Sequence, residues 1–298
     1  MIDKNEGETS FNVVRRLRRI LNLKKIGHSG TLDPFATGLL IILLGQGTKL
    51  SPYLMAGEKR YLATMRLGVE TDTLDPTGQI VHTRPVPEFE KEEIEENILK
   101  FVGDIEQVPP VFSAVNYKGK RAYELAREGI KIELQKRVVK IHSIEIVSID
   151  LPEITIEISC SGGTYIRSLA ADMGRQLGSV AHLKSLRRLS SGPFQVRDAL
   201  DSQQIDFITQ VNLLKEKIIP LKDALPDMYE FRVDIETAKK IRNGYRPRWE
   251  DIADRSGFSG ICEGLMKLVN GKSLVAVMEV NDSPGDKKDW VNKLRIFN

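Results

Sequence analysis

Residues 25–44 read KIGHSGTLDPFATGLLIILL, a glycine-containing polar loop followed by a wholly apolar run. The run Leu39–Leu44 is too short to cross a membrane and is typical of a buried strand. Because Asp is a favoured helix N-cap and Pro favours the first helical position, Asp33-Pro34 predicts a short helical turn that Gly38 ends. Such a pair is most often a structural cap. Its place between a flexible loop and a rigid strand is also how a catalytic nucleophile is held.

A second segment, residues 59–68, reads KRYLATMRLG. Tyr61 and every second residue after it are apolar or small, which predicts a half-buried strand with Tyr61 near its start. As a core residue, Tyr61 needs only a hydrogen-bond partner for its hydroxyl. As a functional residue, it offers an aromatic plane for a nucleobase and a phenol close to the chemistry.

A third segment, residues 161–174, reads SGGTYIRSLAADMG and follows an alternating strand over residues 154–160. Its apolar residues recur at helical spacing. With Thr164 as N-cap, Arg167 falls in the first helical turn, where the helix dipole disfavours a cation. A solvated arginine explains this position, and so does a specific anionic partner, either a carboxylate or a phosphate.

Together with AHLKSLRRL at residues 181–189, these segments resemble the motifs of the TruB family of pseudouridine synthases. The resemblance extends from about Asn12 to the C-terminus. Two further stretches, QVPPVFSAV at residues 107–115 and GKRAYELAREG at residues 119–129, resemble the bacterial stand-alone branch of that family. Its guide-RNA-dependent relatives usually lack the second stretch.

The resemblance implies catalytic roles for three residues. Asp33 matches the essential aspartate, which acts on the target uridine so that the base detaches, rotates and rejoins the ribose through C5. Tyr61 matches the tyrosine that stacks on the flipped base and is a candidate for removing the C5 proton. Arg167 matches the arginine that pairs with the catalytic aspartate.

The resemblance also implies four substrate-binding positions. His28 matches a histidine that takes the place of the extruded nucleotide in the RNA stack. Lys49 and Asp75 match positions near the site, and Leu186 matches an apolar residue of the pocket wall. We expect all four to lie at the site.

The implied chemistry agrees with elementary physics. A base inside a folded RNA must be extruded before it can react, and stacking on aromatic or imidazole rings offsets part of that cost. Asp33 must be ionised, and both a helix N-terminus at Pro34 and a nearby Arg167 are expected to favour its charged form. The rearrangement is internal to the substrate, so it requires no metal or redox cofactor. The four histidines of the chain show no ligand spacing.

Composition sets the outer limits. The 298 residues are long enough for two domains. Cys160 and Cys262 are the only cysteines, which fits a reducing cytoplasm, and we expect no signal peptide and no membrane span. The formal net charge is only +3, but basic residues cluster at 15–19, 24–25, 118–121 and 239–242. Clusters near the Asp33 loop favour contacts with RNA phosphates, although a solvated helix face also explains them.

The pattern of elements predicts an α+β fold. A helix over about Ser10–Leu21 and an acidic helix over Glu88–Val102 are expected among strands near 39, 61, 79, 138–149 and 154–160. Neighbouring strands with short turns favour a mainly antiparallel mixed sheet with inserted helices, which agrees with a pseudouridine synthase fold.

A proline-rich stretch at Pro220–Pro226 predicts a linker between two domains. We expect a catalytic domain over residues 1–222 and a small RNA-binding domain over residues 228–298. The second contains a helix with a glycine stop within 231–245 and strands near 265–269, 274–280 and 294–297. This arrangement resembles a PUA-like β-barrel, although a structural cap without RNA contact also fits.

Three functional hypotheses follow. The first is an isomerase that makes pseudouridine at uridine 55 (tRNA numbering) in the T loop of tRNA, acting as a cytoplasmic monomer on the T-arm stem-loop without a protein partner. The second is a guide-directed or rRNA-directed pseudouridine synthase, which the stand-alone stretches disfavour. The third is a tRNA-folding chaperone without turnover, which the intact Asp33, Tyr61 and Arg167 disfavour.

Overall fold

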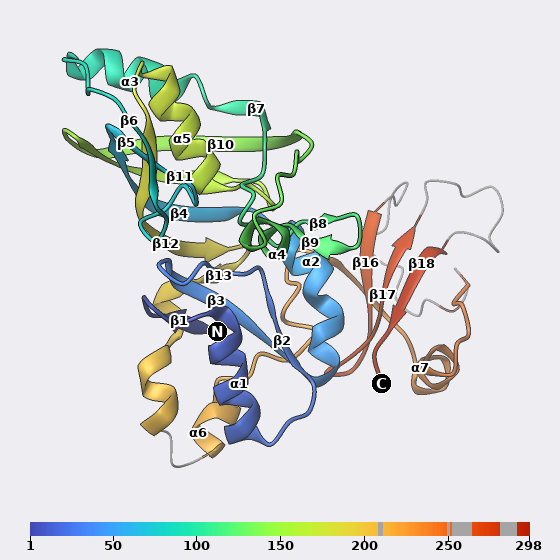
Figure 1. The fold of residues 1–298 in the computed structure, drawn as a ribbon. Coiled ribbons are helices and arrows are strands. Elements are labelled where there is room, and N and C mark those ends of the chain that lie inside the picture. The colour runs from blue at the N-terminus through green and yellow to red at the C-terminus, as the bar shows by residue number, and fades with distance from the viewer. Residues whose placement is uncertain (208–210, 249–250, 252–263, 281–290) are drawn as a thin grey trace. The chain divides into compact units, whose positions relative to one another are not determined.

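The computed structural model describes residues 1–207, 211–248, 251, 264–280 and 291–298, which fall into two compact units (Figure 1). The first unit comprises Met1–Asn22, Ile26–Ile42 and Ser51–Phe207. The second comprises Leu23–Lys25, Leu43–Leu50 and the described residues from 211 onward. No helix in these ranges is long and apolar enough to cross a membrane.

A mixed sheet forms the centre of the first unit. Within the described residues its strand order is β14-β1-β3-β12-β4-β11-β10-β7, with β13 paired to β12 and β2 to β3. Only the β1–β14 and β3–β12 pairs are parallel among those whose direction is assigned, so the predicted, mainly antiparallel α+β fold is confirmed. The strands of this sheet are β1 (Ile2–Lys4), β2 (Ile26–Ser29), β3 (Thr37–Leu44), β4 (Lys59–Leu67), β7 (Gly103–Gln107), β10 (Arg137–Asp150), β11 (Glu153–Cys160), β12 (Ala181–Ser191), β13 (Phe194–Gln195) and β14 (Leu200–Asp201).

Strand β4 lies between β11 and β12 and follows the predicted alternation. Its residues Tyr61, Ala63, Met65 and Leu67 are all buried. Tyr61 is paired in register with Ile158 of β11 on one side and with Arg188 of β12 on the other. The alternation therefore places the Tyr61 side chain on the covered face of the sheet.

Helices and two small hairpins complete the first unit. Helix α5 packs on β12 and β4 through buried residues such as Leu169 and Met173, and it also touches α3 (Figure 1). The predicted helix over Ser10–Leu21 is confirmed, whereas the acidic helix is shorter than predicted. These elements are α1 (Ser10–Leu21), α2 (Ser51–Ala56), α3 (Lys91–Leu99), α4 (Ala122–Arg127), α5 (Ile166–Gln176), the β5–β6 hairpin (Val69–Thr71, Ile80–Thr83), the β8–β9 hairpin (Asn116–Tyr117, Lys120–Arg121) and short 3₁₀ turns at Val196–Asp198 and Ser202–Phe207.

Two details of the Asp33 segment differ from the prediction. Asp33-Pro34 does not begin a helix: the Ala36 N–H donates to the Asp33 carbonyl at 3.1 Å, which closes a single turn before β3. Gly38 does not end that turn but lies inside β3 with φ +100°. A Cβ there would be 2.3 Å from the Arg188 carbonyl oxygen, so the close approach of β12 requires glycine.

The N-terminus of α5 also begins one residue later than predicted. Its N-cap is Tyr165 instead of Thr164, and no side chain caps the helix there. Arg167 is the second helical residue, so its predicted place in the first turn is confirmed. The helix dipole therefore does face a cation at this end.

The second unit carries its own sheet and core. The strand order is β15-β16-β17-β18, and Phe231, Ile241, Leu268 and Met278 belong to a buried cluster between this sheet and α7. The sequence predicts a small barrel, but the described strands form an open four-stranded sheet, with no pairing between β15 and β18 in that part of the chain. The elements are a 3₁₀ helix (Gly45–Leu50), α6 (Val211–Glu216), β15 (Tyr229–Arg232), α7 (Ile235–Arg242), β16 (Gly264–Asn270), β17 (Ser273–Val280) and β18 (Val291–Ile296).

The predicted linker is attached to this second unit. The buried Lys267 of β16 donates from Nζ to the carbonyl oxygens of Lys222 and Leu225, both at 2.9 Å. Of the two cysteines, Cys160 is buried as a free thiol, and Cys262 lies outside the described residues.

Candidate active site

A cavity of about 620 Å³ opens in the first unit, on the side of the sheet where Tyr61 lies. Five of the seven predicted site residues line it: Asp33, Tyr61, Asp75, Arg167 and Leu186. They come from the loop before β3, from β4, from the turn after β5, from α5 and from β12. Segments more than a hundred residues apart in the sequence are thus brought to one hollow.

Arg167 is the centre of this arrangement. Its side chain is 5% exposed, and all five of its N–H donors have acceptors. Nε is 2.9 Å from Oδ2 of Asp33, and Nη2 donates to Oδ1 of Asp33 at 3.4 Å. The remaining donors reach Asp75 Oδ2 at 3.3 Å and the carbonyl oxygens of Thr73 and Phe112, each at 2.8 Å. The guanidinium is therefore fixed in orientation.

Asp75 contacts the Arg167 guanidinium on the side away from Asp33. Its Oδ1 accepts from the Thr73 hydroxyl at 2.7 Å and from the N–H and hydroxyl of Thr77 at 2.9 and 2.6 Å. Only 6% of its side chain is exposed. Because Asp75 is fully bonded, it acts as a fixed carboxylate that holds the arginine.

The Asp33 carboxylate is the least covered member of this ion-pair chain, with 34% of its side chain exposed. Its pKa is raised above the ordinary value: burial raises it, Arg167 opposes this, Asp75 adds to it and Lys4 opposes it. Arg167 favours the charged form of Asp33, as predicted, but the predicted helix N-terminus at Pro34 does not exist, and the effect of burial on the pKa outweighs that of the arginine.

Lys4 holds the turn that carries Asp33. Its Nζ donates to the carbonyl oxygens of Asn5, Glu8 and Pro34 at 2.9, 2.8 and 3.2 Å. Burial lowers the pKa of Lys4 to about 8, and its positive charge in turn lowers the pKa of Asp33. A cation beneath the turn thus helps to fix the carboxylate.

Tyr61 is paired with Arg188, a cation that is not among the predicted site residues. Burial raises the pKa of Tyr61, whereas the Arg188 charge and a hydrogen bond between the Arg188 and Tyr61 side chains lower it. Arg188 is 1% exposed and is held by the carbonyl oxygens of Leu39 at 2.7 Å and Gly30 at 3.1 Å. Leu186, Arg188 and Ser190 are all buried on β12, where an arginine is unusual.

Two predicted residues do not line the cavity. His28 is half-buried on β2; its Nδ1 has no hydrogen-bond partner among the described residues, and burial together with Arg188 lowers its pKa. Lys49 belongs to the second unit, where its Nζ donates to the Ile296 carbonyl at 2.7 Å and lies 5.7 Å from the Phe297 ring centre.

The cavity is built for a ligand that is partly apolar and partly polar. Tyr61 and Leu186 offer apolar surface, and Asp33 presents a partly exposed carboxylate beside them. Its volume lies within the range of small-molecule sites, which is enough for a single nucleotide unit. In the described part of the chain, no three histidine, cysteine or carboxylate side chains are grouped as metal ligands would be.

Two family models match the chain. The model described as the N-terminal domain of TruB family pseudouridylate synthases matches residues 18–166. The model described as the C-terminal domain of tRNA pseudouridylate synthase B matches residues 167–226. Between them, the two matches span every residue that lines the cavity.

Relatives and solved structures agree with these models. The chain is 40% identical over 301 residues to the tRNA pseudouridine synthase B of Geobacter sulfurreducens, covering 100% of this chain and 98% of that protein. It is 47% identical over 255 residues to the tRNA pseudouridine synthase B of Clostridium kluyveri, covering 86% of each. Among solved structures, a chain of a Cbf5-Nop10-Gar1 complex is similar with a TM-score of 0.73 and 26% identity, covering 100% of this chain and 83% of that one.

Proposed function

The chain belongs to the TruB family of pseudouridine synthases, and we propose that it converts uridine 55 in the T loop of tRNA to pseudouridine. It is thus an isomerase that acts on a uridine of tRNA. The observation that carries the proposal is the Asp33–Arg167 pair beside Tyr61 in one cavity. That pair supplies a fixed carboxylate next to a surface on which a base can stack.

The reaction exchanges one glycosidic bond for another. The C1′–N1 bond of the uridine breaks, a C1′–C5 bond forms, and the proton lost from C5 is balanced by one gained at N1. The uridine must first leave the RNA stack, and the cavity offers Tyr61 and Leu186 as walls for the extruded base. Nothing in this balance calls for an external oxidant or reductant.

Asp33 acts on the extruded uridine, either by attack or by taking a ribose proton, and both routes require the ionised carboxylate. Arg167 supports ionisation and fixes the position of both carboxylate oxygens. Tyr61 stacks on the base and presents its hydroxyl for the C5 proton. Arg188 lowers the pKa of that phenol against the effect of burial, which is the assistance a phenol needs before it can accept a proton.

We propose that the chain works as a monomer in the cytoplasm, without a guide RNA or a protein partner. The stand-alone stretch at residues 119–129 supports this, because it forms β9 and α4, from which Tyr123 and Arg127 line the cavity. The basic clusters of the chain supply cations for the phosphates of the T arm. His28 and Lys49 remain proposed RNA contacts, and the second unit is the proposed RNA-binding domain.

The decisive experiment measures tritium release from tRNA labelled at uridine C5. We expect about one equivalent per tRNA, both from whole tRNA and from an isolated T-arm hairpin, and none from the T arm when cytidine replaces uridine 55. Asp33→Asn is the inactive control. Asp172→Asn is the matched control, since it neutralises a carboxylate on the helix that carries Arg167 but outside the cavity.

The other hypotheses give different results. If tritium were released only after a guide RNA or an rRNA fragment is added, the hypothesis of a guide-directed or rRNA-directed synthase would replace this proposal. Tight tRNA binding by the unmodified chain without tritium release would favour the chaperone hypothesis.

A further inference from the structure

A long loop, residues 108–136, leaves the sheet between β7 and β10. The residues at its two ends, Gln107 and Arg137, are paired in register across these antiparallel strands. Both of them contact the same residue, Tyr165, which is the N-cap of α5. Because Tyr165 precedes Arg167 by two positions, the base of the loop is connected to the helical turn that carries the arginine.

Gln107 contacts the backbone of Tyr165. Its Nε2 donates to the Tyr165 carbonyl at 2.9 Å, and the Tyr165 N–H donates to its Oε1 at 2.7 Å. Gln107 is 0% exposed, so water does not compete for either bond. A primary amide both donates and accepts, which lets one side chain bond to both backbone polar groups of one residue. The Tyr165 side chain makes no capping hydrogen bond, and the two Gln107 bonds hold the backbone of this N-cap residue instead.

Arg137 holds the side chain of the same tyrosine. Its guanidinium carbon lies 4.5 Å from the centre of the Tyr165 ring, within the range of a cation–π contact, and Nη2 donates to the Gly163 carbonyl. Tyr165 is therefore fixed through its backbone by one end of the loop and through its ring by the other. Tyr165 also lines the catalytic cavity.

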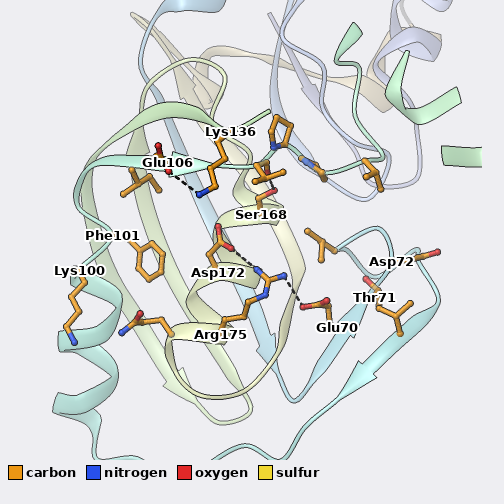
Figure 2. A pocket seen from close by; sticks show the side chains of 18 residues that line it. Glu70, Thr71, Asp72, Lys100, Phe101, Glu106, Lys136, Ser168, Asp172 and Arg175 are labelled. Atoms are coloured by element: carbon orange, nitrogen blue, oxygen red, sulfur yellow. Dashed lines mark hydrogen bonds and ion pairs between the residues drawn. The ribbon is translucent and has the colours of Figure 1, made fainter. Parts of the chain in front are cut away.

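A further bond joins the same two segments at Ser168 of α5. The Ser168 hydroxyl donates to the Val108 carbonyl at 2.8 Å. Figure 2 shows Ser168, Asp172 and Arg175 of α5 around a second cavity, of about 710 Å³, which Arg167 does not line. The Ser168 bond is therefore similar in length and burial to the Gln107 bonds and comes from the residue next to Arg167. Because it does not involve the N-cap residue, it can serve as a control.

We propose that Gln107 is a positioning residue for the reaction: by holding the Tyr165 peptide, it fixes where α5 begins and so where the Arg167 guanidinium meets Asp33. This inference rests on the proposed function, because its readout is turnover of tRNA. Gln107 does not line the cavity and acts through Tyr165 and Arg167. Displacing a catalytic group by an ångström can reduce a rate on the order of 100-fold.

The test compares single-turnover rates of tritium release for the full chain, Gln107→Met, Gln107→Glu and Ser168→Ala, from about pH 5 to about pH 9. Methionine keeps the length of glutamine but makes neither bond. We expect Gln107→Met to lose roughly tenfold to 100-fold in rate, with tRNA affinity unchanged. Ser168→Ala should lose far less.

The pH profiles separate positioning from simple destabilisation. The charged groups that act on Asp33 are Arg167, Asp75 and Lys4, and Tyr61 lies in the same cavity. A loosened Arg167 raises the pKa of Asp33 further, so the rate of Gln107→Met relative to the unmodified chain should fall as the pH falls. The ratio for Gln107→Glu should rise instead, because a protonated carboxyl again donates one bond and accepts one.

The inference would be overturned if, for both Gln107 variants, the rate relative to the unmodified chain did not change with pH. A Ser168→Ala profile that matches that of Gln107→Met would overturn it as well. If Gln107→Met does not fold, as its melting temperature would reveal, the rising ratio of Gln107→Glu is the deciding result. Absence of turnover by the unmodified chain would instead refute the proposed function, so the two failures are distinct.

Discussion

Arg167 meets Asp33 side-on: its Nε is 2.9 Å from one carboxylate oxygen, and its Nη2 is 3.4 Å from the other. The opposite edge of the same guanidinium reaches Asp75. One buried cation is therefore shared by two carboxylates, of which only Asp33 is substantially exposed to the cavity. This asymmetry supports the proposed roles, in which Asp75 holds the arginine and Asp33 acts on the substrate.

Replacing Asp33 tests the chemical role. Asp33→Asn keeps the shape of the side chain and removes the ionised group, so turnover should fall on the order of 10⁴-fold or more, as for other essential catalytic groups. Binding of tRNA, measured by filter retention, should stay within about twofold. Turnover near that of the unmodified chain would contradict the assignment of Asp33.

Arg167→Lys tests the geometry of the cation. Lysine keeps the charge but offers three donors from a single point, so it cannot span both carboxylates and two carbonyl oxygens. We expect turnover to fall at least about 100-fold. Arg167→Met should in addition lose about 3–5 kcal/mol of unfolding free energy, because it leaves Asp75 buried without its cation. Urea denaturation measures that loss, and a fully active lysine variant would show that the paired geometry is unimportant.

The raised pKa of Asp33 has opposite effects on rate and on stability. The rate should fall as the pH falls through a value above that of an ordinary carboxylate, because only the ionised form acts. Between the unfolded and folded pKa values the folded state binds more protons than the unfolded state, so the contribution of Asp33 to stability should decrease as the pH rises. Comparing the unfolding free energy with that of Asp33→Asn across this range isolates the effect; a difference that grows more favourable to Asp33 at higher pH would show that the shift has the other sign.

Gly38→Ala should be strongly destabilising, by about 3 kcal/mol or more, because the new Cβ meets the Arg188 backbone and the residue has a positive φ. Gly7→Ala is the matched control, since Gly7 has φ +83° but nothing within 4 Å of the added carbon. The control should cost only about 1 kcal/mol. Thermal and urea unfolding measure both losses. If Gly38→Ala and Gly7→Ala lost the same unfolding free energy, the close approach of β12 to Gly38 would contribute nothing.

Periodicity predicted the sheet well. The alternation from Tyr61 to Leu67 and the apolar run Leu39–Leu44 identified β4 and β3, because burial of one or both faces of a strand leaves a direct pattern in the sequence. The helix at Pro34 was wrong because its signal is local, whereas β3 begins only three residues later and pairs with β1 and β12. Tertiary pairing outweighed the local preference.

The site was only partly visible in the sequence. The resemblance to a known family, and not the local patterns alone, singled out Asp33, Tyr61 and Arg167, and the structure places them at one cavity. The carbonyl partners of Arg167 at Thr73 and Phe112 could not be predicted, because backbone acceptors leave no residue-type signal. The direction of the Asp33 pKa shift was also beyond the sequence, since it depends on how far burial outweighs a known neighbour.

The full set of acceptors around Arg167 has a consequence for how the protein holds RNA. A guanidinium whose five donors are all engaged by protein oxygens cannot displace counterions from a nucleic-acid backbone. The dependence of affinity on ionic strength should therefore have the same slope with and without this arginine. The affinity for the polyanionic RNA and the reactivity toward one nucleoside are then set by separate groups, so either can change in evolution while the other is preserved.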